Sequence, residues 1–151
     1  MSYRDQLTQF GNRYAVDWFV EHEWNGEQIG VVYCDITGLK KVNDEQGHEA
    51  GDRLIIRACE CLAGVFKGYG LYRIGGDEFL VLCLGIEEKD LREHVEKLHM
   101  DMKEHQVTMA VGMIWKEHGP KDIDLLLNES ERLMYEDKDR YYKEHGLKRR
   151  R

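Results

Sequence analysis

The sequence has 151 residues, with 22 Lys or Arg against 29 Asp or Glu, so its formal net charge is −7. That length suits one domain that buries a core without cross-links, and 42% hydrophobic with 34% charged residues is typical of a globular chain. The acidic balance argues against a general nucleic-acid binder, and no apolar run approaches the ~18 residues that span a bilayer. We therefore expect a soluble domain that contacts neither nucleic acid nor membrane.

The four cysteines lie inside apolar runs and form no C-x-x-C pair. Cys59-x-Cys61 has no matching pair of Cys or His nearby, which a zinc site would need. We expect Cys34, Cys59, Cys61 and Cys83 to be buried, reduced thiols of a cytoplasmic protein, with no zinc site.

The first half of the chain predicts a helix, a strand and a second helix. Apolar residues at helical spacing follow Asn12, which can cap a helix. The β-rich run 29–36 predicts a buried central strand that ends near Asp35. Residues 37–47 are rich in Gly, Lys, Asn and Asp and predict a loop, and 49–66 carry one apolar helical stripe.

The second half predicts a hairpin, two helices and a further strand. Residues 71–74 and 78–84 read as strands joined by a turn at Gly75-Gly76-Asp77, since glycine takes positive φ freely in such turns. The remaining expected elements are a helix over 87–104, a strand over 107–115, a helix over 122–144 with Leu126, Leu133, Met134 and Tyr141 inside, and a frayed basic tail, 148–151.

The order of these elements is typical of an α+β sandwich of ferredoxin-like type. Such a domain has one mostly antiparallel sheet with helices on its faces. We expect residues 1–151 to form this single domain.

Three acidic residues are the candidates for chemistry. Asp35 ends a predicted strand and Asp77-Glu78 stand at the tip of the hairpin, so neighbouring strands would bring them side by side. Carboxylates held that close repel one another and favour a bound cation, and Mg²⁺ suits hard oxygen ligands together with substrate phosphates. The alternative is that Asp35 caps a loop and the other two are ordinary turn residues.

The segment after Asp35 carries groups that a nucleotide would need. Gly38 leaves backbone N–H groups open to a phosphate, and Lys40 and Lys41 add positive charge. Asn43 and Asp52 could recognise a purine edge through hydrogen bonds. The alternative is a set of solvated surface charges around an ordinary turn.

Arg73-Ile74 followed by Gly75-Gly76-Asp77-Glu78-Phe79 resembles the signature of the GGDEF family of diguanylate cyclases. The family's spacing also matches Asp35-Ile36, Asn43-Asp44, Gly47-His48 and Gly51-Asp52, its opening Asp5-Gln6-Leu7-Thr8 and Asn12-Arg13, its late strand 107–112, and its last helix Met134-Tyr135-x-x-Lys138. The resemblance covers essentially the whole chain. It implies a palm-like fold, as in adenylyl cyclases, with the signature on the β-hairpin.

The resemblance further implies condensation of two GTP molecules into cyclic di-GMP, with release of two pyrophosphates. In such enzymes each domain of a homodimer binds one GTP, and each 3′-hydroxyl attacks the α-phosphate of the other nucleotide. Magnesium, or manganese, is the implied cofactor. A domain of this kind usually belongs to a longer sensor protein.

The family's roles transfer by position onto this sequence. Asp35 and Asp77 would bind magnesium through their side chains and Ile36 through its carbonyl, and Asp77 or Glu78 would help to deprotonate the 3′-hydroxyl. The other implied roles are guanine recognition by Asn43 and Asp52 and phosphate binding by Gly38, Leu39, Lys40 and Lys138.

Three positions depart from the family pattern. Thr37 stands where many relatives carry a second Asp, and Tyr142 where many carry a phosphate-binding Arg, for which Arg140 lies nearby. The product-inhibition motif R-x-x-D is absent, because 66–69 read Phe-Lys-Gly-Tyr, so we expect no inhibition through that site.

Two alternatives to an active cyclase remain. One is a catalytically silent module that binds GTP or a protein partner in signalling. The other is a cyclase that makes an adenine-containing product, which Asp52 at the base-reading position disfavours.

Overall fold

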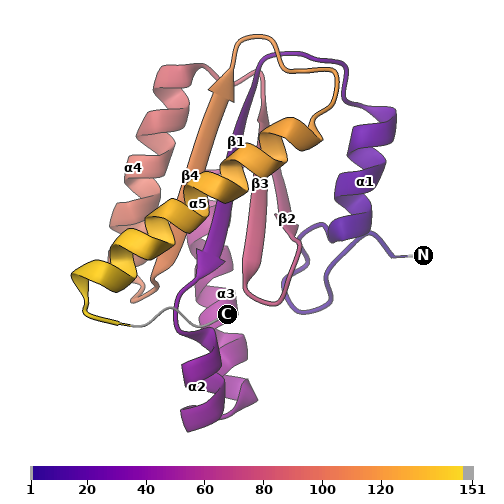
Figure 1. Ribbon diagram of the computed structural model, residues 1–151. Coiled ribbons are helices and arrows are strands. Elements are labelled where there is room, and N and C mark those ends of the chain that lie inside the picture. The colour runs from indigo at the N-terminus through magenta and orange to yellow at the C-terminus, as the bar shows by residue number, and fades with distance from the viewer. Residues whose placement is uncertain (1, 148–151) are drawn as a thin grey trace.

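The structure is a computed structural model that describes residues 2–147. Four strands form one sheet and five helices surround it (Figure 1). In chain order the elements are α1 (Arg13–His22), β1 (Ile29–Ile36), α2 (Leu39–Gln46), α3 (His48–Val65), β2 (Gly70–Arg73), β3 (Glu78–Leu84), α4 (Glu88–Glu104), β4 (Met109–Lys116) and α5 (Asp124–Glu144). The predicted α+β fold is confirmed, and the tail 148–151 lies outside the described residues.

The sheet has the order β2-β3-β1-β4, and every neighbouring pair is antiparallel. β1 is therefore central and pairs with β3 on one side and β4 on the other. All eight of its residues are buried, which agrees with its β-branched, apolar sequence. This order places the end of β1 next to the start of β3.

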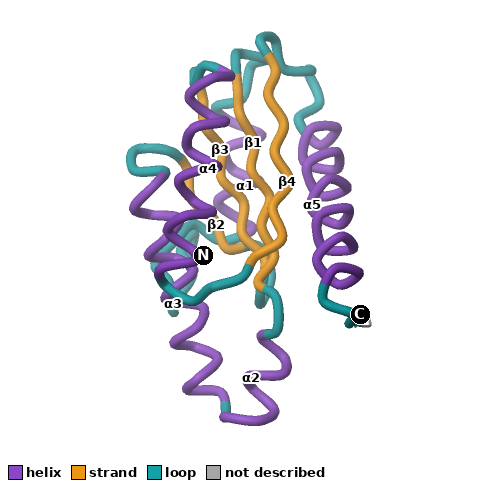
Figure 2. Tube along the Cα trace, turned by 90° about the vertical axis from the view of Figure 1, so that its left-hand side faces the viewer, coloured by secondary structure: helices purple, strands orange, loops and turns teal. Residues whose placement is uncertain are grey.

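Helices cover both faces of the sheet. Alternate residues of each strand point to opposite faces, so Val32 and Phe79 pack toward α3 and α4 whereas Val31 and Leu80 pack toward α1 and α5. Figure 2 shows α5 on one side of the sheet and α3 with α4 on the other. Each layer closes one of two hydrophobic clusters.

The cysteines belong to these clusters. All four are buried and free, as expected for reduced thiols. Burial raises the pKa of Cys59 and Cys83 to about 12 and that of Cys61 to about 11. The thiols therefore remain protonated at neutral pH.

The predicted loop 37–47 is wrong, because the structure has helix α2 there. Gly38 (φ 81°) and Gly47 (φ 91°) bracket the helix with left-handed or otherwise positive φ, and the Gly47 N–H closes it by donating to the Asn43 carbonyl. Only Leu39 and Val42 pack against the core, which is too few apolar residues to produce a helical period in the sequence. α2 is stabilised by packing against α3, and together they project beyond the end of the sheet (Figure 1).

The inner side of α5 also differs from the prediction. Leu126 and Met134 are buried as expected, but Leu133 and Tyr141 are only partly buried. Ser130 is fully buried instead, because the helix backbone at this residue lies directly against Gly112 of β4.

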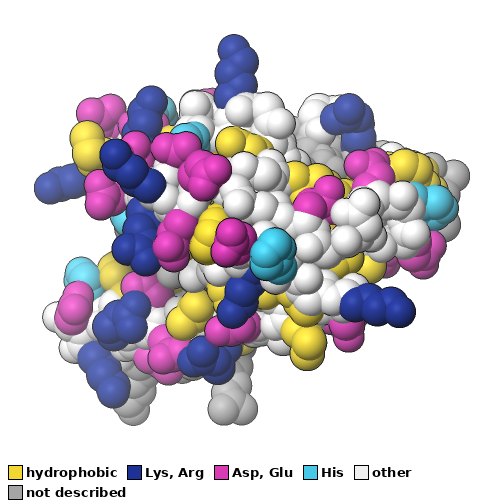
Figure 3. Space-filling model, turned by 90° about the horizontal axis from the view of Figure 1, so that it is seen from above, with side chains coloured by type: hydrophobic (Ala, Val, Ile, Leu, Met, Phe, Trp, Pro, Cys, Tyr) yellow, Lys and Arg dark blue, Asp and Glu magenta, His cyan; other side chains and the backbone are white. Residues whose placement is uncertain are grey.

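Within residues 2–147, no helix combines the length and the apolar character that crossing a bilayer requires. Basic and acidic side chains are interspersed over the end of the molecule that Figure 3 presents. Neither sign of charge dominates that face.

Candidate active site

The two acidic motifs meet where β1 ends and β3 begins. Asp35 is 4% exposed and is the register partner of Glu78. The Ile36 N–H donates to the Asp77 carbonyl at 2.8 Å, which holds the two segments together just beyond this pair. The structure thus brings the three predicted carboxylates to one end of the sheet.

The hairpin turn is held by Arg73. Its guanidinium donates to the Gly76 carbonyl at 2.8 Å and to the Asp5 carboxylate at 3.2 Å, and the Ile74 N–H donates to the Glu78 carbonyl at 2.9 Å. The N-terminal segment is therefore bonded to the turn that carries the acidic motif. A charged group with two such acceptors is held far more rigidly than a surface side chain.

The glycines of the turn do not have the backbone conformation predicted for them. Neither Gly75 nor Gly76 has a positive φ, so the expected backbone requirement is wrong. A Cβ at Gly75 would come within 3.0 Å of the Glu78 Oε1 atom. The carboxylate of Glu78 thus folds back against the turn at Gly75.

The N-terminus of α2 faces the acidic residues. Gly38 caps the helix in the left-handed conformation, and no side chain accepts a hydrogen bond from the first turn. Backbone N–H groups at a helix start favour an anion such as a phosphate. Lys40 and Lys41 lie in this first turn and line the same cleft.

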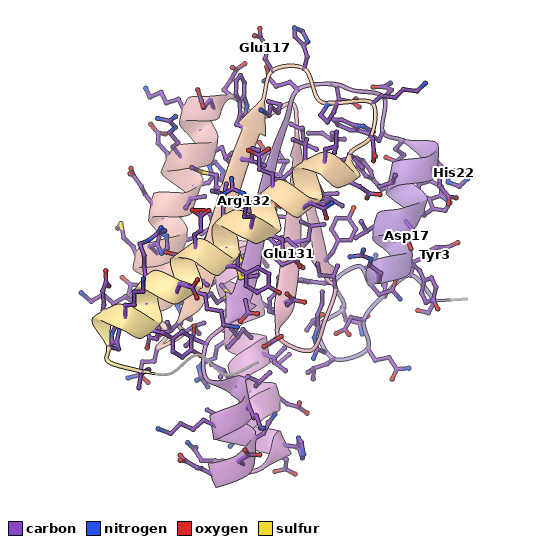
Figure 4. All side chains as sticks on the ribbon, viewed as in Figure 1. Tyr3, Asp17, His22, Glu117, Glu131 and Arg132 are labelled. Carbon is purple, nitrogen blue, oxygen red and sulfur yellow. The ribbon has the colours of Figure 1, made fainter. Side chains whose placement is uncertain are left out.

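Helix α5, which packs on one face of the sheet, contributes side chains to the site. Lys138 Nζ lies 3.3 Å from Asp35 Oδ1, and the two side chains are only 13% and 6% exposed. Glu131, two turns earlier, lies 3.0 Å through its Oε2 from the hydroxyl of Tyr33. Figure 4 labels Glu131 beside Arg132 on α5; Glu131 is half-buried, whereas Arg132 is exposed and pairs with Glu136.

These groups line a cleft of about 1320 Å³, large enough for a nucleotide. Eight of the residues predicted for the site line it: Asp35, Ile36, Gly38, Leu39, Lys40, Asp77, Glu78 and Lys138. Asn43 and Asp52 do not. The Asn43 side chain lies over Gly51, where a Cβ would come within 1.7 Å of its Oδ1 atom, and Asp52 is exposed on α3.

The cleft also contains residues that the sequence argument did not assign. Tyr135, Tyr141 and Tyr142 line it from α5. Tyr33 and Glu131 lie beside the cleft without lining it. Tyr33 could have been found from the two-residue period of a strand, because it lies on the same face of β1 as Asp35. Glu131 carried no such signal, since its position depends on how α5 crosses the sheet.

The electrostatics of the site favour a cation. Burial raises the pKa of Glu78, as do the negative charges of Asp35, Asp77 and Glu131, while a hydrogen bond from Tyr33 opposes this. Among the described residues, no group of three or more His, Cys, Asp or Glu side chains is arranged to hold a metal ion by itself. Two carboxylates with a carbonyl could hold Mg²⁺ only if water and substrate phosphates completed its shell.

The sequence of this chain matches that of a known protein family. The sequence profile of the family described as diguanylate cyclase, GGDEF domain, matches residues 2–143. The chain belongs to the GGDEF domain family. The predicted resemblance is thereby confirmed.

Curated relatives of this GGDEF domain have different named activities. The diguanylate cyclase DgcP of Escherichia coli is 30% identical over 152 residues, which cover 91% of this chain and 45% of DgcP. The cyclic di-GMP phosphodiesterase PdeR of the same organism is 30% identical over 151 residues, covering 89% of this chain and 22% of PdeR. The chain thus spans less than half the length of either relative.

Solved GGDEF domains share the fold. The GGDEF domain of DgcB from Caulobacter crescentus, in complex with c-di-GMP, gives a TM-score of 0.78 at 20% identity, covering 99% of this chain and 94% of that one. The GGDEF domain of FimX from Pseudomonas aeruginosa gives 0.80 at 17% identity, covering 91% and 94%. These likenesses establish the architecture.

The structure also places the departures from the family pattern. Tyr142 lines the cleft, whereas Arg140 points to Asp137, at 3.2 Å, and does not line the cleft. Arg140 therefore does not substitute for an arginine at position 142. Thr37 follows the end of β1 and donates its N–H to the Thr108 carbonyl.

Proposed function

We propose that this GGDEF domain is a diguanylate cyclase that condenses two GTP molecules into cyclic di-GMP and two pyrophosphates. The observation that carries the proposal is the meeting of Asp35, Asp77 and Glu78 at a cleft that also contains the N-terminus of α2, where no side chain accepts from the first-turn N–H groups. Acidic groups for a cation and N–H groups for phosphates then face one nucleotide-sized space. Intact carboxylates at all three positions favour an active enzyme over a degenerate one.

In this mechanism, each of two domains holds one GTP and presents it to the other. The 3′-oxygen of one nucleotide forms a bond to the α-phosphorus of the second, and the bond to pyrophosphate breaks. The hydroxyl proton passes to the carboxylate of Asp77 or Glu78, and the raised pKa of Glu78 suits a proton acceptor. The same exchange in the opposite direction closes the ring.

The divalent cation would be held by the side chains of Asp35 and Asp77 and by the carbonyl of Ile36. Mg²⁺, or Mn²⁺ in its place, would supply positive charge to the phosphates during transfer. Lys138 holds Asp35 in place by pairing with it, and it lies within the cleft for contact with phosphate.

We assign the phosphates to the start of α2, and the base to the side of α2 that packs against α3. The backbone at Gly38 and Leu39, with Lys40, forms the phosphate seat. Asn43 and Asp52 remain our assignment for guanine, supported by the exposure of Asp52 on α3. Reading of a base there requires the Asn43 carboxamide to turn away from Gly51.

The alternative is a domain that binds GTP without turnover. Tyr142 favours it, because a tyrosine cannot supply the charge that an arginine gives to a triphosphate. Tyr142→Arg should then lower the Kd for GTP measured by calorimetry. An unchanged Kd would show that this position does not limit nucleotide binding.

The deciding experiment incubates concentrated protein with GTP and Mg²⁺ and identifies products by liquid chromatography and mass spectrometry. Asp77→Ala should abolish cyclic di-GMP, whereas Asp17→Ala, at an exposed position on α1, should not. The rate should rise faster than linearly with protein concentration while dimers are scarce. Absence of product from the wild type, also when fused to a dimerising coiled coil, would favour the silent module.

A further inference from the structure

One oxygen of the Glu78 carboxylate contacts a side chain of the central strand. Oε2 lies 3.3 Å from the hydroxyl of Tyr33, and Oε1 lies over Gly75, which has no side chain to hold it. A glutamate side chain has several rotatable bonds and otherwise samples many orientations at a turn. The contact with Tyr33 favours one of them.

Tyr33 is itself a rigid support. Its ring is buried in the central strand, with 6% exposure, and its hydroxyl lies 3.0 Å from Glu131 Oε2. The phenol has a single O–H proton, which Glu131 Oε2 at 3.0 Å and Glu78 Oε2 at 3.3 Å share as acceptors. The hydroxyl is thus fixed between α5 and the hairpin.

The same helix therefore reaches two carboxylates of the site. Lys138 pairs directly with Asp35, and Glu131, seven residues earlier on the same side of α5, reaches Glu78 through Tyr33. Neither Tyr33 nor Glu131 belongs to the glycine-rich signature or lines the cleft, so neither is expected to touch the nucleotide.

We propose that Tyr33, anchored by Glu131, is a positioning residue that holds the Glu78 carboxylate in the orientation needed to meet the attacking 3′-hydroxyl. This inference rests on the cyclase function proposed above. A hydrogen bond made before the reaction avoids the cost of orienting the group during it. Its loss should lower turnover without weakening nucleotide binding.

The first test is independent of activity. Glutamate carrying ¹³C in the carboxyl group is incorporated, and the Glu78 resonance is assigned by its loss in Glu78→Gln. Tyr33→Phe removes only the hydroxyl and should move that resonance, whereas Tyr72→Phe, a hydroxyl removed from the same layer of the sheet, should leave it in place. An unmoved resonance in Tyr33→Phe would overturn the proposed contact.

The second test separates turnover from binding. Tyr33→Phe should lower kcat by about tenfold, with the KM for GTP within about twofold of the wild type. Glu131→Leu should lower kcat by about threefold, and Glu131→Gln, which keeps an acceptor for the phenol, should restore it. Tyr72→Phe should keep the wild-type kcat and KM.

A double variant shows whether the two residues act together. Adding Glu131→Leu to Tyr33→Phe should cause no further loss, because the anchor acts only through the hydroxyl. An unchanged kcat in Tyr33→Phe, or multiplied losses in the double variant, would overturn the positioning role. If the wild type forms no cyclic di-GMP, the proposed function fails, and the ¹³C resonance alone then decides whether Tyr33 holds Glu78.

Discussion

Replacement of Gly112 by alanine tests how α5 is seated on the sheet. A Cβ at this position in β4 would lie 2.2 Å from the Ser130 carbonyl oxygen and 2.4 Å from the Met134 nitrogen. Both are backbone atoms, so no change of rotamer relieves the overlap. The helix must move by about 1 Å to regain an ordinary contact, and we expect Gly112→Ala to cost about 3 kcal/mol, the upper end for overpacking.

The measurement is equilibrium unfolding in urea, followed by far-UV circular dichroism. Gly64→Ala is the matched control, because Gly64 is exposed within α3 and a Cβ there meets nothing within 4 Å. Alanine should stabilise that helix position by about 0.5–1 kcal/mol. A Gly112→Ala variant within about 0.5 kcal/mol of the wild type would refute the packing argument.

The same shift has a consequence for the proposed activity. Movement of α5 carries Lys138 away from Asp35 and Glu131 away from Tyr33. A displacement of about 1 Å in positioning groups can cost about 10²-fold in rate. Gly112→Ala protein that is fully folded, by its circular dichroism without urea, should therefore form cyclic di-GMP far more slowly, and full activity would show that α5 tolerates the displacement.

Four further predictions concern the hairpin turn, Glu78, the cysteines and the product site. Arg73→Ala, which removes the hydrogen bonds to Gly76 and Asp5, should lower the free energy of unfolding in urea by about 2 kcal/mol. Arg73→Lys should not restore this stability, because an ammonium cannot reach both acceptors as the planar guanidinium does. Equal stability of Arg73→Lys and wild type would contradict this. Burial and nearby carboxylates raise the pKa of Glu78, so the folded protein binds that proton more tightly than the unfolded chain; in metal-free buffer its contribution to stability should fall as pH rises above the ordinary value of 4.5, and Glu78→Gln should flatten the profile. Burial raises the pKa of Cys83 to about 12 and that of the other cysteines as well, so a thiol reagent should modify native protein slowly and unfolded protein at all four sites; rapid native labelling would contradict burial. Cyclic di-GMP added to the assay should leave the initial rate unchanged if no product site replaces the missing R-x-x-D motif.

Sequence reasoning succeeded where a signal was local and repeated. The uninterrupted apolar run of β1 and the helical stripe of α3 each predicted an element to within a residue or two. It failed at α2, whose helix depends on packing against α3 rather than on its own apolar residues. It also expected a positive φ at Gly75, which the structure does not have.

The sequence by itself determined the family, the fold class and the carboxylates at the hairpin, because these are encoded in contiguous motifs and in periodic patterns. Only the tertiary structure decided which residues support them. The pairing of Lys138 with Asp35 and the contact of Glu131 with Tyr33 join segments about a hundred residues apart. They exist because α5 crosses the sheet in close contact with Gly112, a geometry set by packing between layers that no local pattern records.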